Sequence, residues 1–312
     1  MSDGRLSPTA GNGQIVVSGL TKHYRNVRAV DNLSFTIEPG RVTGFLGPNG
    51  AGKTTTLRML LNLVTPTAGA ATISGIRYAD LPDPIRHVGA VLEASSAHKG
   101  RTGINHLRVV CAAAGLPKQR ADEALALVGL SPAAKRKFKG YSLGMKQRLG
   151  IAAAMLGDPK VLILDEPANG LDPEGIRWMR GFLKNLAAEG RTVLVSSHLL
   201  SEMQLLADDV VIIAAGKLVR QGRVDEVVGS MAHTTRIRVR TPQSDELVAA
   251  LAEHDAKVEP GEGGVLLVSG VDAPTVGRAA LAAKVELHEL TTERPDLEGV
   301  FLELTAGKAA IR

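Results

Sequence analysis

The sequence has one cysteine, few aromatic residues and no long apolar run. Because Cys111 stands alone, an intrachain disulfide framework is excluded, and the chain is compatible with a reducing cytosol. Aromatic residues account for 3% of the chain, so Ala, Val, Leu and Ile must build the core. No segment approaches the roughly 18 continuous apolar residues of a membrane-spanning helix. The polar first dozen residues lack the pattern of a secretory signal. We therefore expect any action at a membrane to come from outside the bilayer.

The composition is otherwise ordinary. Hydrophobic residues make up 44% and charged residues 22%, as in soluble globular proteins. A length of 312 residues favours two domains. The formal net charge of +5 is compatible with nucleic acid, with anionic lipid or with a nucleotide-phosphate ligand. The charge alone does not choose among these partners.

The most specific motif spans residues 47–55 and matches the nucleotide-binding pattern G-x-x-x-x-G-K-S/T. An apolar strand is expected before it and a helix over Thr55–Leu63 after it. Glycines let such a loop turn tightly and present backbone N–H groups to a polyphosphate. Lys53 would reach the outer phosphates, and the Thr54 hydroxyl would ligate Mg²⁺. The candidate phosphate-binding residues are Gly47, Pro48, Asn49, Gly50, Ala51, Gly52, Lys53, Thr54 and Thr55.

Two further predicted strands end in polar residues. The apolar run Val161–Leu164 is typical of a strand buried on both faces, and Asp165 and Glu166 follow it directly. Ligands of open α/β sheets bind at the carboxyl edge of the strands, so both carboxylates should lie near the phosphate loop. Asp165 is suited to hold Mg²⁺ and Glu166 to polarise an attacking water. A second strand, Thr192–Ser196, ends near His198, which makes this histidine a candidate for the same site.

The rest of the N-terminal region carries weaker signals. Residues 1–14 are expected to form a flexible tail, and Ile15–Val17 and Leu33–Ile37 to form short strands on either side of a polar stretch that contains Tyr24. Residues 65–75 carry turn signals. Between about residues 94 and 158, helical patterns predominate, which indicates a helical insert in an α/β domain.

Two adjoining segments of this insert have two interpretations each. The basic run of residues 135–139, Lys-Arg-Lys-Phe-Lys, is either a solvated face or a contact for phosphate or a partner. Residues 141–145 precede a predicted helix over Gln147–Leu156 and place Ser142 ahead of Gly144. A serine in this position is either an ordinary N-cap or part of an anion site.

Taken together, these motifs resemble those of the nucleotide-binding subunit of ABC transporters, over about residues 15–222. The phosphate loop matches, Tyr24 lies where the family has an adenine-stacking aromatic, and residues 141–145 occupy the place of the family signature Leu-Ser-Gly-Gly-Gln. Residues 161–167 match the magnesium strand with its catalytic Glu166, residues 169–172 match the loop at the dimer interface, and His198 matches the switch histidine.

The resemblance implies a phosphate-loop NTPase fold of the α/β class, with a RecA-like core, a helical subdomain at about 94–158 and an antiparallel β subdomain. It also implies ATP and Mg²⁺ as ligands, and a head-to-tail dimer, with a second copy or a paralogue, that places Ser142 and Gly144 of one chain on the ATP of the other. Hydrolysis at Glu166 and His198 would drive separate transmembrane permease subunits from the cytoplasmic face of the membrane.

The sequence departs from the family pattern at the signature and at one metal position. Leu143 and Met145 replace the usual Gly and Gln, although the serine and second glycine expected to touch the γ-phosphate are kept. Glu93 stands where the family commonly has a Gln near Mg²⁺ and the membrane subunit. A carboxylate there could ligate the metal, so Glu93 joins Thr54 and Asp165 as a candidate metal residue.

Residues 223–312 are expected to form a separate α+β domain. The predicted order is a strand at 236–239, a helix at 245–253, strands near 258 and at 265–268, a helix at 273–282, a strand at 285–290 and a helix at 297–304. That order suggests a ferredoxin-like module. It resembles the tails of bacterial ATPases that serve exporters of drugs, antibiotics or lipids, with a regulatory or dimer-stabilising role as the expectation.

Two other classes of protein remain open. A soluble ABC ATPase acting on ribosomes or DNA is compatible with the basic charge. However, the chain lacks the tandem cassette of translation factors and the long coiled coil of DNA-repair members, so a nucleic-acid partner is not favoured. An importer cassette would differ mainly in the tail and the membrane partner. We expect an exporter ATPase.

Overall fold

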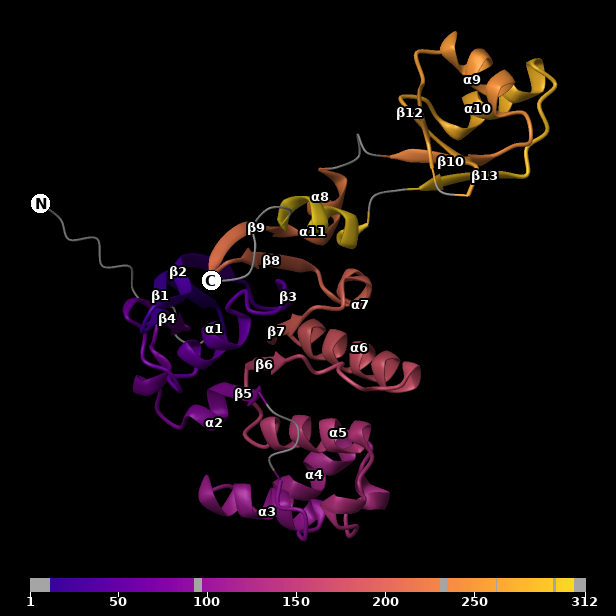
Figure 1. Ribbon diagram of the computed structural model, residues 1–312. Helices are drawn as coiled ribbons and strands as arrows, with labels where there is room; N and C mark the ends of the chain where they lie inside the picture. Colours follow the sequence, from indigo (N-terminus) through magenta and orange to yellow (C-terminus); the bar gives the residue numbers. More distant parts are fainter. Residues whose placement is uncertain (1–11, 93–96, 231–234, 262, 294–295, 306–312) are drawn as a thin grey trace, which may run out of the picture. The chain divides into compact units, whose positions relative to one another are not determined.

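The computed structural model describes residues 12–92, 97–230, 235–261, 263–293 and 296–305 (Figure 1). The chain divides into two compact units. The first unit comprises the residues up to Val224 and those from Leu304 onward, and the second comprises Asp225–Glu303.

A six-stranded sheet forms the centre of the first unit, in the order β5-β6-β7-β3-β8-β9. All neighbours are parallel except β9, which is antiparallel to β8. Every residue of β3 and β7 is buried, as expected for a sheet covered on both faces. The strands are β3 (Val42–Leu46), β5 (Val88–Val91), β6 (Val161–Asp165), β7 (Thr192–Ser197), β8 (Asp209–Ala214) and β9 (Lys217–Arg223).

The register of this sheet brings three strand ends together. Asp165 of β6 pairs with Ser196 of β7, and Ser196 pairs in turn with Phe45 of β3. The loops that leave β6, β7 and β3 therefore start at one level of the sheet, which is the arrangement that binds ligands in open α/β folds.

Helices α1 (Lys53–Leu60), α2 (Pro84–His87), α6 (Pro173–Ala188) and α7 (Leu200–Leu206) accompany the sheet. The start of α6 follows from its sequence, because Asp172 caps it through a bond from the backbone N–H of Gly175 and Pro173 occupies the first turn. Met179, Leu183 and Leu186 form its buried face. The helix packs on β7 and β3 and so fixes the loop that precedes it.

A separate three-stranded antiparallel sheet has the order β2-β1-β4, with β1 (Ile15–Tyr24), β2 (Val27–Ile37) and β4 (Ala68–Ile73). Two sequence expectations need correction here. The polar stretch around Tyr24 is mostly a β-hairpin, because only two residues, Arg25 and Asn26, separate the end of β1 from the start of β2. Residues 65–75, for which the sequence indicates turns, contain the strand β4. This strand is rich in Ala and Gly and is held by its pairing with β1.

The helical subdomain consists of α3 (Gly103–Ala113), α4 (Gln119–Leu127) and α5 (Leu143–Ala154), which Figure 1 shows grouped together. Thr102 caps α3, and Ser142 caps α5 by accepting a bond from the backbone N–H of Met145. Its core contains Leu107, Cys111, Leu125 and Leu149, which are at most 1% exposed. The signature segment thus begins a helix.

The second unit is built around a four-stranded antiparallel sheet in the order β11-β12-β10-β13. This is the strand order of ferredoxin-like β-α-β-β-α-β folds. One expected strand is displaced: it lies at Glu289–Glu293 rather than at 285–290, because Val285 packs into the hydrophobic core before the strand begins. The elements over residues 224–305 are α8 (Val224–Gly229), β10 (Arg236–Arg240), α9 (Ser244–Ala252), β11 (Lys257–Pro260), β12 (Val265–Ser269), α10 (Ala273–Ala282), β13 (Glu289–Glu293) and α11 (Leu297–Thr305).

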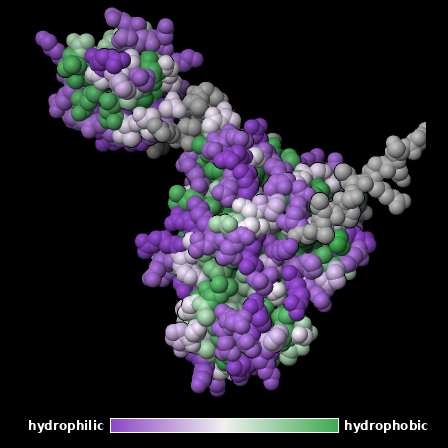
Figure 2. Space-filling view, turned by 180° about the vertical axis from the view of Figure 1, so that it is seen from behind, coloured by the Kyte–Doolittle hydropathy of each residue, from purple (hydrophilic) through white to green (hydrophobic). Residues whose placement is uncertain are grey.

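Hydrophilic residues cover most of the face seen in Figure 2, and apolar residues form separated groups on it. Among the helices of the described chain, none has both the length and the hydrophobicity of a bilayer-spanning segment.

Candidate nucleotide-binding and catalytic site

The phosphate loop joins β3 to α1, and glycine is required at two of its positions. A Cβ on Gly47 would lie 2.7 Å from the carbonyl oxygen of Ile213, and one on Gly52 would lie 2.5 Å from that of Ala29. Gly52 also has φ +101°, in the left-handed region that favours glycine. No side chain caps α1 at Gly52. The first N–H groups of the helix are therefore free of a side-chain cap and suited to bind an anion.

A cavity of about 440 Å³ opens over this loop. Its volume is within the usual range of small-molecule sites. The lining residues come from the loop, from β2 and from the residue after β6: Val27, Ala29, Pro48, Asn49, Gly50, Ala51, Gly52, Lys53, Thr54, Thr55 and Glu166. The structure thus places eight of the nine predicted loop residues around one cavity, with Gly47 behind it as the close-packed backbone position.

Lys53 is only 7% exposed and lies under the loop. Its ammonium group donates to the carbonyl oxygens of Gly47 at 2.6 Å and Pro48 at 3.4 Å. The Nζ atom also lies 3.7 Å from Oε1 of Glu166. A buried ammonium between the loop and a carboxylate is positioned for the outer phosphates of a nucleotide.

Thr54 and Asp165 meet as a magnesium site would require. Oγ1 of Thr54 donates to Oδ2 of Asp165 at 2.8 Å, which confirms that β6 ends beside the phosphate loop. The described residues contain no group of three or more Asp, Glu, His or Cys side chains able to hold a metal. One carboxylate and one hydroxyl are nevertheless a donor set that suits Mg²⁺, which binds few protein oxygens and takes others from phosphates and water.

Glu166 occupies a constrained position at the end of β6. Its φ of +49° is in the left-handed region, which is unusual for a residue with a side chain. The backbone N–H of Glu166 donates to Oγ of Ser196 at 3.0 Å, and Oε2 lies 2.8 Å from Nδ1 of His198. The side chain is 22% exposed, so its carboxylate is accessible from the cavity. The structure therefore brings together Lys53, Glu166 and His198.

Ser196 and Gln147 contribute contacts that sequence reasoning missed. The Ser196 hydroxyl donates to Oδ1 of Asp165 and accepts from the N–H of Glu166, so one buried group contacts both carboxylate residues. Gln147 of α5 is 6% exposed and donates to the carbonyl oxygen of Pro167 at 2.7 Å. That bond ties the signature helix to the loop after Glu166. The sequence signal that could have identified Ser196 is its position as a polar residue at the end of a buried strand.

The signature residues Ser142 and Gly144 line a different cavity, of about 350 Å³, together with Gly170 and Asp172. Within the described chain, no residue of the loop 47–55 lines this second cavity. Leu143, which replaces the usual glycine, is 46% exposed, and its Cδ2 would lie 2.3 Å from a Cβ on Gly170. The signature and the loop at 169–172 therefore pack closely and face a space that the phosphate loop of the same chain does not reach.

Two predicted residues lie outside these arrangements. Tyr24 is 45% exposed at the end of β1, with Nζ of Lys22 5.0 Å from the centre of its ring. It is not among the described residues that line the cavity over the phosphate loop, where Val27 and Ala29 lie instead. Glu93 falls outside the described residues.

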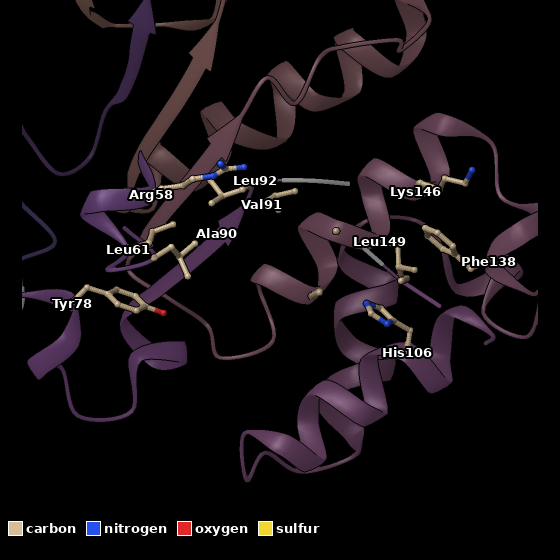
Figure 3. A pocket seen from close by; sticks show the side chains of 14 residues that line it. Arg58, Leu61, Tyr78, Ala90, Val91, Leu92, His106, Phe138, Lys146 and Leu149 are labelled. Atoms are coloured by element: carbon tan, nitrogen blue, oxygen red, sulfur yellow. The ribbon is translucent and has the colours of Figure 1, made fainter. Parts of the chain in front are cut away.

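A third cavity, also of about 440 Å³, has walls from the core and from the helical subdomain (Figure 3). His106 lies in it, half-buried, and burial together with the nearby charge of Arg101 lowers the pKa of this imidazole. Its Nδ1 is buried without a hydrogen-bond partner among the described residues. The remaining labelled residues in Figure 3 are Arg58, Leu61, Tyr78, Ala90, Val91, Leu92, Phe138, Lys146 and Leu149.

The loop, its cavity and the paired carboxylates define a nucleotide-binding protein of the phosphate-loop class. Comparison with known proteins identifies the family. The family model for ABC transporters matches residues 30–169, and a model described as "Domain of unknown function (DUF8746)" matches residues 235–298. An uncharacterized ABC transporter ATP-binding protein of Bacillus subtilis, YhcH, is 40% identical over 93% of this chain and 95% of its own length.

Further relatives and solved structures support the same family. The daunorubicin/doxorubicin resistance ATP-binding protein DrrA of Streptomyces peucetius is 34% identical over 95% of this chain and 93% of its own. The bacitracin transport ATP-binding protein BcrA of Bacillus licheniformis is 44% identical over 66% and 69%.

An ATP-binding subunit of an ABC transporter superposes with a TM-score of 0.63 at 29% identity, covering 70% of this chain and 92% of that one. A dimeric bacterial ABC transporter cassette gives 0.61 at 25% identity, covering 67% and 98%. The chain belongs to the ATP-binding proteins of ABC transporters, a family that binds and hydrolyses ATP.

Proposed function

We propose that this chain is the ATP-hydrolysing subunit of an exporter for drugs, antibiotics or lipids, and that it drives separate membrane subunits. The observation that carries the catalytic part is the contact of Glu166 with both His198, at 2.8 Å, and Lys53, at 3.7 Å, beside the phosphate loop. The exporter assignment is supported by similarity to proteins named for resistance to daunorubicin and for bacitracin transport.

In the proposed mechanism, the backbone N–H groups of the loop and the ammonium of Lys53 bind the phosphates. Thr54 and Asp165 would hold Mg²⁺, which when bound offsets the phosphate charge. Glu166 accepts a proton from the attacking water as general base. His198 holds the Glu166 carboxylate through Oε2, so that Oε1 remains on the side of Lys53 and the cavity.

Ser142 and Gly144 would complete the site from a second chain. The signature cavity and the phosphate-loop cavity have separate linings in one chain. A head-to-tail pair of chains would bring a signature to each loop. The helix N-terminus at Ser142 would then face the γ-phosphate.

The membrane subunits would dock at the cavity of Figure 3. It is lined by apolar residues of the core and the helical subdomain and has the cations of Arg58 and Lys146 among its lining residues. Leu92 and Ala97, which stand on either side of residues 93–96 in the sequence, are part of that lining. The chain would then lie on the cytoplasmic face of a membrane, next to its permease.

The test of the enzymatic proposal is turnover of ATP with Mg²⁺ by the purified chain. We expect Glu166→Gln to reduce kcat by on the order of a hundredfold or more, because it removes the base while keeping the shape of the side chain. Nucleotide affinity, measured by equilibrium binding, should be almost unchanged.

Lys53→Ala is the matched comparison, because it should weaken nucleotide binding itself by roughly tenfold or more. If Glu166→Gln lowers affinity and turnover equally, Glu166 is a binding residue and the catalytic assignment is wrong.

A further inference from the structure

The helical subdomain has a larger net positive charge than the whole protein. Residues 97–157 contain eleven Lys and Arg residues and two acidic residues. Since this segment carries +9 and the whole chain +5, the remaining residues together carry −4. The two acidic residues, Asp122 and Glu123, are paired with Arg108 and Arg120. The excess charge is therefore concentrated elsewhere in the subdomain.

Six of these cations lie on two neighbouring segments, residues 99–101 and 135–139. We name these six residues the basic ridge: Lys99, Arg101, Lys135, Arg136, Lys137 and Lys139. The backbone holds the segments together, because the N–H of Phe138 donates to the carbonyl of Arg101 at 2.9 Å and that of Lys139 to the carbonyl of Lys99 at 3.0 Å. Phe138 is 3% exposed and anchors the ridge in the subdomain. The nearby Lys146 is held over the Phe138 ring at 5.5 Å.

The charges of the basic ridge are exposed and without acidic partners. Five of the six residues are exposed, and Arg101 is partly buried. No ion pair links any of the six to an acidic side chain of the described chain. Like charges this close repel one another, so their arrangement is explained best by an external anionic partner.

We propose that the basic ridge binds the anionic headgroups of phospholipids at the membrane surface. Four of its six cations are lysines, whose flexible point charges suit a diffuse anionic surface, whereas a single protein carboxylate is bound best by the planar fork of arginine. Sequence-tolerant binding of single-stranded nucleic acid relies on exposed aromatic rings, whereas Phe138, which lies between Lys137 and Lys139, is buried. The proposal does not depend on the nucleotide site.

The test uses the full chain with vesicles of phosphatidylcholine alone or mixed with phosphatidylglycerol, and measures binding by co-sedimentation. The ridge variant is Lys135→Gln/Lys137→Gln/Lys139→Gln. The matched control, Lys118→Gln/Lys184→Gln/Lys257→Gln, removes the same charge from exposed positions outside the ridge. Each lysine near an anionic surface strengthens binding by about fivefold, so we expect the ridge variant to lose far more than tenfold.

The expected pattern has four parts. Wild type and control should bind the anionic vesicles, neither should bind phosphatidylcholine alone, high salt should release both, and Lys135→Arg/Lys137→Arg/Lys139→Arg should retain binding. Unchanged thermal unfolding and ATPase activity would show that the ridge variant is folded.

Equal binding by the ridge and control variants would overturn the proposal, because only total charge would then matter. Absence of wild-type binding would also overturn it and would leave an acidic segment of the permease as the partner. Binding to duplex DNA without binding to anionic vesicles would assign the ridge to nucleic acid instead.

Discussion

The Ser196 hydroxyl lies between the two carboxylate residues of the candidate site. It is fully buried, donates to Asp165 and accepts from the backbone N–H of Glu166. The bond to Asp165 fixes the carboxylate that faces Thr54, and the bond from Glu166 supports a backbone with φ +49°. In the proposed mechanism, Ser196 is therefore a positioning residue for both the metal side and the base side of the reaction.

We predict that Ser196→Ala lowers kcat about tenfold or more while changing nucleotide affinity by less. Loss of the hydroxyl removes the donor to Oδ1 of Asp165, which costs about 1–3 kcal/mol. The N–H of Glu166 loses one of its two acceptors and keeps the carbonyl oxygen of Ser196 at 3.2 Å. The steady-state ATPase rate and the equilibrium affinity for nucleotide measure the two effects.

Ser197→Ala is the control for Ser196→Ala, because Ser197 is the next residue of β7 and is only 1% exposed. Its hydroxyl accepts a bond from the N–H of Leu199, and within the described residues it bonds to neither carboxylate residue. A similar loss of kcat in both variants would mean that Ser196 acts only through the stability of the strand.

His106 should make the stability of the protein depend on pH. Burial, with the charge of Arg101, lowers the pKa of this imidazole from 6.5 in the folded state. The unfolded chain then binds the proton more readily, so stability is lost as the pH falls below about 6.5.

His106→Asn should remove that loss. When the pH is lowered from 7.5 to 5.5, the melting temperature of the variant minus that of wild type should increase, as measured by thermal unfolding. His254→Asn, at an exposed position, is the control and should track wild type at both pH values. A constant difference in melting temperature across this range would disprove the role of His106.

At the scale of single elements, local capping sets the entry to the helices that carry the site. Oδ1 of Asp172 accepts from the backbone N–H of Gly175 at 2.8 Å and begins α6 directly after the loop at 169–172. Ser142 begins α5 in the same way. Both caps lie beside the signature cavity, so the geometry of that cavity depends on where these helices start.

We predict that Asp172→Ala destabilises the nucleotide-free protein by about 1 kcal/mol, while Asp172→Asn costs much less because an amide oxygen also caps a helix. Thermal unfolding measures the difference, which should be a shift of a few degrees. If the Ala and Asn variants melt together, the cap does not determine where α6 starts.

The elements that the sequence predicted well are those whose signals are local. The buried strand before Asp165 was predicted from its apolar run, and the Asp172 cap with Pro173 is a local signal of the same kind for the start of α6. In contrast, β4 has alanines and glycine where strands usually carry branched residues, and its existence depends on pairing with β1. The buried bond from Gln147 to Pro167 joins segments twenty residues apart, and no local pattern announces it.

At the scale of the whole molecule, the separate linings of the two cavities support the proposed pair of chains. Lys53 belongs to one cavity and Ser142 to the other. If ATP is bound between two chains, each site combines Lys53 of one with Ser142 of the other. In a homodimer of Lys53→Ala, or of Ser142→Arg, both sites are therefore defective.

A mixture of these two variants should recover ATP-dependent dimerisation, which neither shows alone. In the mixed dimer both lesions fall in one site, and the other site has an intact phosphate loop and an intact signature. Analytical ultracentrifugation with ATP and Mg²⁺ measures the dimer directly and does not require turnover. ATP-dependent dimers of each single variant would refute the shared site. If the mixture stays monomeric while wild type forms a robust dimer, one intact site is not enough to form the dimer. Either the two substitutions then do not complement each other, or the dimer needs ATP at both sites.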